Sequence, residues 1–456
     1  MDGVSLQMTA IDAMRGLWAA AFGACVGSLI NVLAYRIPRG MDYVTPTSRC
    51  PSCSTKLTWR ENIPIFGWLM LRGKCRFCRS PISPEYPIVE SIVALLWFVA
   101  FMVCYADEYA GLSFFLHLQP EWARSGFVQT WPIFLVIVTL LSSLVAMTIV
   151  DAKTYTIPEQ LTNFPTIVGL VVNPLAAIWV QHKYGQLTHA APGYSWSLWT
   201  PDHFGWWWVG AALGGAVGWG IANLLLWKKI LKRTFGEEYV AWETEAIQKI
   251  EAAQAEREAK IAAGEQVADE DDPTQQQLWI KYPHARREMA REALFVGVIL
   301  ACALIGGMIA YKAVGPWAYN PNTLVEEPMN DAARVPLWLM VLSGSLLGYL
   351  IAGGFVWFCR IIATLAFGKE ALGIGDVHMM AAVGACIGWI DPVIAFFLAA
   401  FLGMFGWIIQ LLTSGENKRL LPYGPFLAMA TVLVWFGKPG VEWVATKLWQ
   451  GGVNWP

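Results

Sequence analysis

The chain has 456 residues, of which 56% are hydrophobic and only 14% are charged, and it contains 25 tryptophans. A soluble domain is closer to half apolar and a quarter charged, so this composition excludes an ordinary soluble protein. The net charge of −2 is by itself uninformative about nucleic acid, and no nucleic-acid partner is expected.

Apolar runs of membrane-spanning length predict an all-α polytopic membrane protein with about eight to ten transmembrane helices. One of these runs, at 377–391, is short and interrupted by glycine, so its ends are the least defined. The predicted spans are 14–34, 86–106, 128–150, 162–181, 205–227, 293–312, 336–358, 377–391, 393–412 and 420–437.

The spans and the polar segments between them divide the chain into five predicted units. They are a first transmembrane helix (1–34), a four-cysteine insert (35–85), a membrane core (86–227), a charged helical insert (228–292) and a second part of the core (293–456). Within the charged insert, residues 243–266 are rich in Glu, Ala, Gln, Lys and Arg, which favours a solvated spacer helix or a partner-docking helix.

Lysine and arginine fix the predicted orientation. They are dense in the insert at 35–85 and sparse in the next loop, near 107–127, so the insert is expected in the cytosol. Alternation of the spans then places Asp151, the 228–292 insert and Asp376 on the same cytosolic side. The orientation was derived without reference to the aspartates, and it predicts that they face one compartment.

Four cysteines in the first insert form a CxxC…CxxC pair, Cys50-x-x-Cys53 and Cys75-x-x-Cys78. Each pair can turn two thiolates onto one ion, and together they complete a closed tetrahedral site. A closed site leaves no position for catalysis, so a structural zinc ion is expected, and an insert of this size needs such support. A redox-active dithiol pair is the alternative. The remaining cysteines lie in or beside spans and are interpreted as packing residues.

Asp151 and Asp376 each place a carboxylate at the mouth of a membrane helix, where an ionisable group is costly and points to function. Peptide hydrolysis by two carboxylates requires them to lie close together across one water, with one carboxyl protonated and the other acting as base. Taken singly, each aspartate is better explained as a helix cap or as the partner of Lys153 or His378. The pair on one face favours catalysis.

Other polar residues near the same face have less specific interpretations. Glu61, Glu85 and Glu90 are candidates for binding the cationic part of a substrate, although an ordinary interfacial role fits Glu90 equally well. Glu370 and His378 flank the second aspartate and either tune it or are merely interfacial.

Taken in order, these motifs resemble the bacterial type IV prepilin peptidases, membrane aspartyl proteases of the GxGD type. The resemblance covers roughly residues 14–165 and 340–435. The matching segments are Gly27–Pro38, the cysteine insert with Trp59–Pro64, Pro81–Glu90, the region of Asp151 with Ile157-Pro158, Gly373-Ile374-Gly375-Asp376 with Gly368–Leu372 before it, and Pro422–Ala428. The chain departs from the usual pattern at His378, where the family has Lys, and at Glu159, where Asp is common.

The resemblance implies an aspartic endopeptidase of the bacterial inner membrane with its active site facing the cytosol. It would cut the short basic leader from prepilin or pseudopilin precursors of type IV pilus or type II secretion systems, with Asp151 and Asp376 activating water. Pro158, Gly373 and Gly375 would support the motif. Many members also methylate the new N-terminus with S-adenosylmethionine, and no residue of this sequence is assigned to that cofactor.

Three alternatives stay open at this point. The chain could be a peptidase without methyltransferase activity or a non-enzymatic assembly factor of a pilus or secretion system. A transporter is disfavoured because neither midplane carboxylates nor repeated halves are visible. For a peptidase, the substrate helix is expected to pack against spans such as 131–150 and 345–366.

Overall fold

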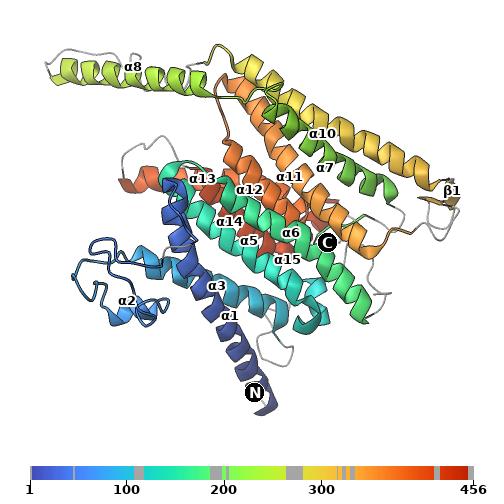
Figure 1. Cartoon of the computed structure of the whole chain (residues 1–456), viewed down its shortest axis with the longest axis horizontal. Helices are drawn as coiled ribbons and strands as arrows, with labels where there is room; N and C mark the ends of the chain where they lie inside the picture. The colour runs from blue at the N-terminus through green and yellow to red at the C-terminus, as the bar shows by residue number, and fades with distance from the viewer. Residues whose placement is uncertain are drawn as a thin grey trace.

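The structure is a computed structural model that describes residues 3–44, 47–106, 118–184, 198–201, 205–262, 281–315, 317–320, 325–328, 334–414 and 422–449. Within these ranges the chain forms a bundle of long helices (Figure 1). In chain order the elements are α1 (Gly3–Arg36), the 3-10 turn η1 (Ile37–Arg39), α2 (Phe66–Met70), α3 (Glu85–Tyr105), the 3-10 turn η2 (Glu121–Ser125), α5 (Phe127–Thr154), α6 (Glu159–Tyr184), α7 (Trp206–Trp227), α8 (Glu237–Ala262), α10 (Ala285–Val314), β1 (Trp317–Asn320), β2 (Val325–Pro328), α11 (Leu337–Phe367), α12 (Ile374–Ile387), α13 (Ile390–Ser414), α14 (Gly424–Phe436) and α15 (Lys438–Trp449).

Among the described residues, eight helices are long and apolar enough to cross a membrane, and α12 and α14 are shorter apolar helices. The predicted polytopic helical fold is confirmed, and the chain is a multi-pass membrane protein. The strands β1 and β2 are a small exception to the all-α expectation. They form an antiparallel hairpin between α10 and α11, with Trp317 opposite Pro328.

The predicted end of the charged insert, at residue 292, stays a prediction, and one helix runs through it. Helix α10 begins at Ala285 and continues without a break into the apolar run, so the predicted boundary at 292–293 falls inside a helix. The reason is that Glu288 and Glu292, which suggested a polar segment, are both buried and bonded to neighbouring elements. Helix α8 confirms a helix in the insert, and residues 263–266 of the predicted one lie outside the described residues.

Helix α5 lies at the centre of the bundle and contributes the longest run of the main hydrophobic core, from Ile133 to Val150. Helices α11 and α12 cross in close contact at Gly348 and Gly384. A Cβ atom built on Gly384 would lie 2.1 Å from the carbonyl oxygen of Gly348, so no larger residue fits. Small residues permit such close helix packing in membranes, and here they hold α12 firmly against its neighbour.

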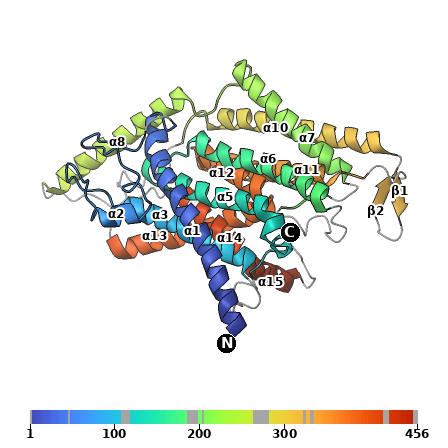
Figure 2. The ribbon, with the colours of Figure 1, turned by 60° about the horizontal axis from the view of Figure 1, so that its bottom comes forward.

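The cysteine insert and the protruding helix α8 lie at one end of the bundle, and the β hairpin lies at the other (Figures 1 and 2). We call the first end the insert end; it comprises the ends of α1, α5 and α11 and the starts of α3, α12 and α14. An ion pair between Lys153, at the end of α5, and Glu85, at the start of α3, ties two of these helices together. Both candidate aspartates lie at this end.

Candidate active site and metal centre

Asp151 lies in the last turns of α5, and its side chain is 6% exposed. Its Oδ2 accepts a hydrogen bond of 3.1 Å from the backbone N–H of Gly424, the first residue of α14. The residue at 424 must be small, because a Cβ there would lie 2.5 Å from the same carboxylate oxygen. Asp151 therefore caps α14, as the helix-capping interpretation expects, whereas Lys153 pairs with Glu85 instead.

Asp376 lies in the first turn of α12 and is 8% exposed. Its backbone N–H donates a hydrogen bond of 3.2 Å to the carbonyl of Gly373, the N-cap residue of the same helix, and its carboxylate lies beside Gly373, where a Cβ atom would be 3.5 Å from Oδ2. Gly375 lies against Ile157: a Cβ atom there would be 2.9 Å from the Ile157 Cβ. Gly375 thus lets the start of α12 approach the α5–α6 connection closely.

The connection between α5 and α6 brings the two aspartates together. Ile157 contacts Gly375, beside Asp376, and also Gly424, which holds Asp151. Pro158 follows Ile157 directly and precedes α6, so it helps to end the turn at this place. The two carboxylates interact electrostatically, and both are buried at the insert end. Such a pair can hold one water between an acid and a base.

The two residues that flank Asp376 have partners of their own. Glu370 accepts a hydrogen bond of 2.7 Å from the guanidinium of Arg360. His378 interacts electrostatically with Glu159 at the start of α6. His378 and Glu159 are the two positions at which the sequence departs from the expected family pattern, so the departures form one pair.

The four cysteine sulfurs of the insert converge on one point, and all lie within 4.8 Å of one another. The Sγ atoms of Cys50 and Cys78 are 3.8 Å apart, and those of Cys53 and Cys75 are 4.0 Å apart. A tetrahedral site with metal–sulfur bonds of about 2.3 Å places its sulfurs about 3.8 Å apart. The predicted four-cysteine site is therefore assembled, and its geometry fits a tetrahedral metal ion.

The backbone around these cysteines favours thiolates. Hydrogen bonds from the backbone of Cys53 and then of Ser52 lower the pKa of Cys50 to about 6, against the opposing effect of desolvation. The two knuckles are similar in detail: Thr55 and Ser80 each lie two residues beyond the second cysteine of a pair, within 3.3 Å and 3.2 Å of its sulfur. Hydroxyl groups placed in this way support metal-bound sulfur.

The three carboxylates proposed to bind substrate cations occupy different environments. Glu61 Oε2 accepts a hydrogen bond of 2.7 Å from the Thr58 N–H, which lowers the pKa of Glu61. Glu90 is buried, and its Oε2 accepts a hydrogen bond of 2.6 Å from the Ile65 N–H in the insert. Glu85 is partly exposed and pairs with Lys153. Their role in substrate binding stays a prediction.

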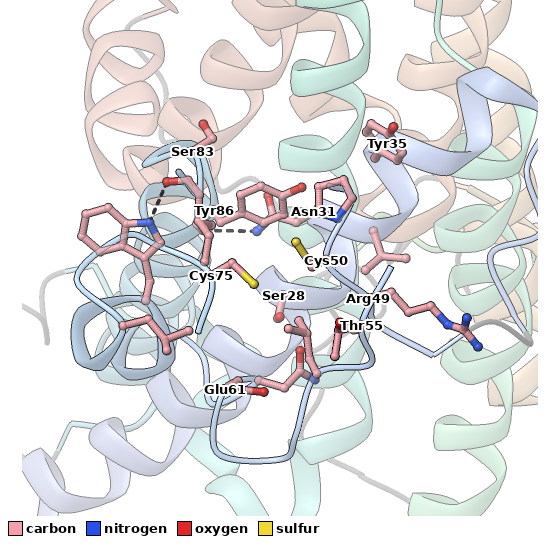
Figure 3. Close-up of a pocket in the computed structure, with 18 of the residues that line it drawn as sticks. Ser28, Asn31, Tyr35, Arg49, Cys50, Thr55, Glu61, Cys75, Ser83 and Tyr86 are labelled. Atoms are coloured by element: carbon pink, nitrogen blue, oxygen red, sulfur yellow. Dashed lines mark hydrogen bonds between the residues drawn. The ribbon is translucent and has the colours of Figure 1, made fainter. Parts of the chain in front are cut away.

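Glu61 and Glu90 line a cavity of about 750 Å³ between the insert, the end of α1 and the start of α3 (Figure 3). Its wall is mixed, with aromatic rings, both signs of charge and two of the cysteines. One buried oxygen in it, Glu61 Oε1, accepts no hydrogen bond. The labelled residues in Figure 3 that line it are Ser28, Asn31, Tyr35, Arg49, Cys50, Thr55, Glu61, Cys75, Ser83 and Tyr86.

Three residues at the insert end were not predicted as part of the site. Gly424 binds Asp151, Arg360 binds Glu370, and Glu292 binds Arg360. The sequence carried a signal for the last two, because charged residues within apolar helices are rare and usually paired. It carried none for Gly424, whose role depends on where α14 begins in space.

Comparisons with known proteins assign the chain to a family. The family model described as the bacterial peptidase A24 N-terminal domain matches residues 21–104. A prepilin leader peptidase/N-methyltransferase of Xanthomonas campestris pv. campestris is 33% identical over 231 residues, which are 46% of this chain and 69% of the relative. One of Klebsiella pneumoniae is 31% identical over 211 residues, 44% of this chain and 78% of the relative. The chain belongs to the type IV prepilin peptidase family.

The similarity is strongest in a short segment. A prepilin leader peptidase/N-methyltransferase of Myxococcus xanthus is 51% identical over 76 residues, which are 17% of this chain and 23% of that relative. No solved structure matches the chain. Each of these family matches covers less than half of this chain, so the membership assigns a family to the molecule and leaves the roles of its individual residues to the geometry described above.

Proposed function

We propose that this chain is an aspartic endopeptidase that removes the basic leader of prepilin-like or pseudopilin-like precursors. The observation that carries the proposal is the shared environment of two buried carboxylates, Asp151 and Asp376, at the insert end of the bundle. The printed names of the relatives, prepilin leader peptidases, supply the substrate class. The dense positive charge of the insert supports a cytosolic location for this end, in a bacterial inner membrane.

The mechanism follows from the chemistry of two carboxyl groups. One carboxylate takes a proton from the bound water, whose oxygen attacks the carbonyl carbon of the scissile bond. The other carboxyl group donates its proton to the carbonyl oxygen. The tetrahedral intermediate then breaks as the first carboxyl group passes the water's proton to the leaving nitrogen and the second carboxylate takes a proton back from a hydroxyl of the intermediate. The backbone N–H of Gly424 holds the Asp151 carboxylate, and the first turn of α12 holds the Asp376 carboxylate beside Gly373, so the pair is positioned before substrate arrives.

The four cysteines would hold a structural zinc ion, because their sulfurs have the spacing of a closed S4 site. An S4 site has no open position, so no step of the cleavage reaction passes through it. Its contribution is to fold the insert and to form one wall of the neighbouring cavity, which Cys50 and Cys75 line.

A second activity, methylation of the new N-terminus, is supported by that cavity. Its volume of about 750 Å³ lies within the usual range of small-molecule sites, roughly 300–1,000 Å³. Tyr35, Trp68 and Tyr86 offer aromatic faces for a sulfonium or an adenine ring, and Glu61 Oε1 is a buried carboxylate oxygen that accepts no hydrogen bond and lies 3.6 Å from Arg76 Nε. S-adenosylmethionine bound there would supply the methyl group, while the chain's own residues would bind and orient it.

The peptidase is tested by cleavage of a purified precursor in detergent, using Asp151→Asn and Asp376→Asn. Each single change should abolish cleavage, because the two carboxyl groups act as a unit. Asp391→Asn is the control, since Asp391 is also buried but lies at the start of α13 and pairs with Lys438. Near-normal cleavage by both Asp151→Asn and Asp376→Asn would refute the proposal.

Methylation is tested by the mass of the product N-terminus. Leu57→Trp places a large ring in the cavity wall and should remove methylation while leaving cleavage intact. Lys56→Trp is the matched control, because Lys56 is the exposed neighbour and is outside the cavity lining. Full methylation by Leu57→Trp would place the methyl donor elsewhere.

A further inference from the structure

A buried arginine connects the charged insert to the loop that carries Asp376. Arg360, near the end of α11, is only 2% exposed. Its Nη1 donates to Glu370 Oε1 at 2.7 Å and to the backbone carbonyl of Leu372. Leu372 is followed by Gly373, the N-cap residue of α12, whose carbonyl accepts a hydrogen bond of 3.2 Å from the Asp376 N–H. The guanidinium therefore fixes the loop between α11 and α12 one residue before the helix start that carries Asp376.

Glu292 of α10 holds the other side of this guanidinium. Its carboxylate accepts hydrogen bonds from Arg360 Nε and Nη2 at 3.1–3.3 Å, and it is 3% exposed. The same carboxylate accepts hydrogen bonds from Trp357 Nε1 at 2.7 Å and from the Thr234 hydroxyl at 2.9 Å. The ring of Phe235 lies against the guanidinium, 5.2 Å from its carbon. Every partner of the ion pair is thus itself held in place.

Lys281 and Tyr282, which precede α10, contact the other end of the 368–372 loop. The backbone N–H of Tyr282 donates to the Gly368 carbonyl at 2.7 Å, and the side chain of Lys281 packs over Gly368. Gly368 has a left-handed backbone (φ 73°), which ends α11 and starts the turn. Residues 281–292 therefore contact the 368–372 loop at its first residue and, through Arg360, at its last.

We propose that Glu292 is a positioning residue for the reaction at Asp376: by orienting Arg360 it holds the 368–372 loop, and so the start of α12, in the geometry that the carboxyl pair requires. The inference rests on the proposed peptidase function. A two-carboxyl mechanism depends on sub-ångström placement, so a small shift of this loop is costly to turnover. A fully bonded buried network is rigid, and loss of one charge loosens all of its members.

The test compares Glu292→Gln with Glu288→Gln. Glu288 lies one turn earlier on α10, is similarly buried, and binds Arg291 and the Phe235 N–H but not Arg360. We expect Glu292→Gln to lower kcat on the order of 10- to 100-fold with little change in KM, because the defect lies in placement of the reacting groups. Glu288→Gln should lower kcat far less, although it perturbs the same helix.

Hydrogen–deuterium exchange of peptides covering 368–376 gives a readout that does not depend on activity. Exchange there should be faster in Glu292→Gln than in the wild type or in Glu288→Gln. Trp357→Phe removes one hydrogen bond to Glu292 and retains an aromatic ring, so it should show the same defects in milder form. This variant provides the test if Glu292→Gln does not fold. If cleavage requires Asp376 but Glu292→Gln leaves both kcat and hydrogen–deuterium exchange unchanged, the positioning role of Glu292 is refuted and the peptidase proposal stands. Wild-type cleavage that survives Asp376→Asn would overturn the peptidase proposal and this assignment with it.

Discussion

The insert at 35–85 and the aspartate site differ in how their residues are brought together. The four cysteines lie within one short polar segment, and two similar knuckles bring them to one point. Asp151 and Asp376 belong to different membrane helices, and they meet only because α5, α12 and α14 pack around Ile157. The insert depends on local spacing and, we propose, on a metal ion. The aspartate site depends on the whole bundle.

The largest expected effect follows from removing the proposed metal, which should unfold the insert and leave the helices around the aspartate site folded. Chelation or Cys50→Ser should unfold the insert, because structural zinc contributes about 10–16 kcal/mol of apparent binding free energy in small domains. The membrane helices should remain folded, since each satisfies its own backbone hydrogen bonds. Limited proteolysis should show cuts confined to the insert, and elemental analysis should give one zinc per chain.

Cys25→Ser is the control for this experiment, because Cys25 lies on α1 and is exposed outside the cluster. It should leave the metal content unchanged. Protein purified without chelator that contains no zinc, or an insert that stays folded without its four cysteines, would contradict the assignment.

A smaller effect is expected from narrowing the aspartate site without removing a carboxylate. In Gly424→Ala the new Cβ would lie 2.5 Å from Asp151 Oδ2 and 3.0 Å from its Cγ, so the carboxylate must move. Cleavage should fall on the order of 100-fold, because the reacting groups are displaced while the helices stay packed. The measurement is kcat on a purified precursor, together with thermal stability in detergent.

Gly354→Ala provides the comparison, since a Cβ at this position on α11 would have no atom within 4 Å. It should leave both cleavage and stability unchanged. Wild-type turnover by Gly424→Ala would mean that Asp151 need not occupy its present position.

The sequence was sufficient for most of the fold, because membrane helices are long apolar runs that need no partner to be recognised. It gave no indication that α10 runs through the predicted end of the charged insert, since Glu292 is a buried partner of Arg360 and the sequence shows only its charge. The hairpin of β1 and β2 gave no signal in composition. Its pairing is set by register between two short loop segments.

The candidate sites were predictable to different degrees, because the cysteine site depends on local spacing and the aspartate site on packing between distant helices. The cysteine spacing alone was enough to predict the metal site. Topology predicted that Asp151 and Asp376 face one side, but their shared contact with Ile157 required three-dimensional packing. Glu61 and Glu90 were predicted to bind substrate, and that role stays a prediction; their hydrogen bonds to the backbone N–H groups of Thr58 and Ile65 could not be read from the sequence.

Glu90, on α3, ties the insert to the membrane helices, and its replacement should loosen the insert without unfolding it. Ile65, whose N–H it binds, has a left-handed backbone (φ 61°) that is unfavourable for a β-branched residue and must be held by its surroundings. Glu90→Gln keeps an acceptor oxygen but replaces a hydrogen bond to a charged group, about 1.5–3 kcal/mol, by a neutral one, about 0.5–1.5 kcal/mol, so it should weaken insert docking by about 1–1.5 kcal/mol. Protease sensitivity of the insert should rise, and methylation should fall more than cleavage.

The matched change is Glu85→Gln, which removes an exposed ion pair with Lys153. Exposed pairs contribute about 0–1 kcal/mol, so this variant should resemble the wild type. Equal effects of the two changes would show that Glu90 has no special part in docking the insert.

The smallest effect is expected from neutralising the Lys and Arg residues of the precursor leader. Of the three acidic candidates at the insert end, Glu61 and Glu90 are bonded to backbone and Glu85 to Lys153, so a leader cation finds only exposed, screened partners. Each such contact contributes about 1 kcal/mol or less and weakens with salt.

The substrate's apolar helix should matter more than its leader, and the structure narrows where that helix packs. Helix α5 is largely enclosed by its neighbours, and the exposed large apolar residues of span 131–150 are Trp131 and Leu135, so packing of substrate on this span stays a prediction. Helix α11 does expose an apolar face near the insert end, formed by Phe358, Ile362 and Leu365.

A charge placed in the first turns of the substrate helix costs about 2.5–3.5 kcal/mol in an apolar environment and should slow cleavage strongly, whereas a neutral leader should slow it only severalfold. Cleavage rates of the two precursor variants at low and high salt provide the measurement. The reverse ranking would mean that the enzyme recognises leader charge, and that docking on α11 is wrong even if Asp151 and Asp376 cleave the bond.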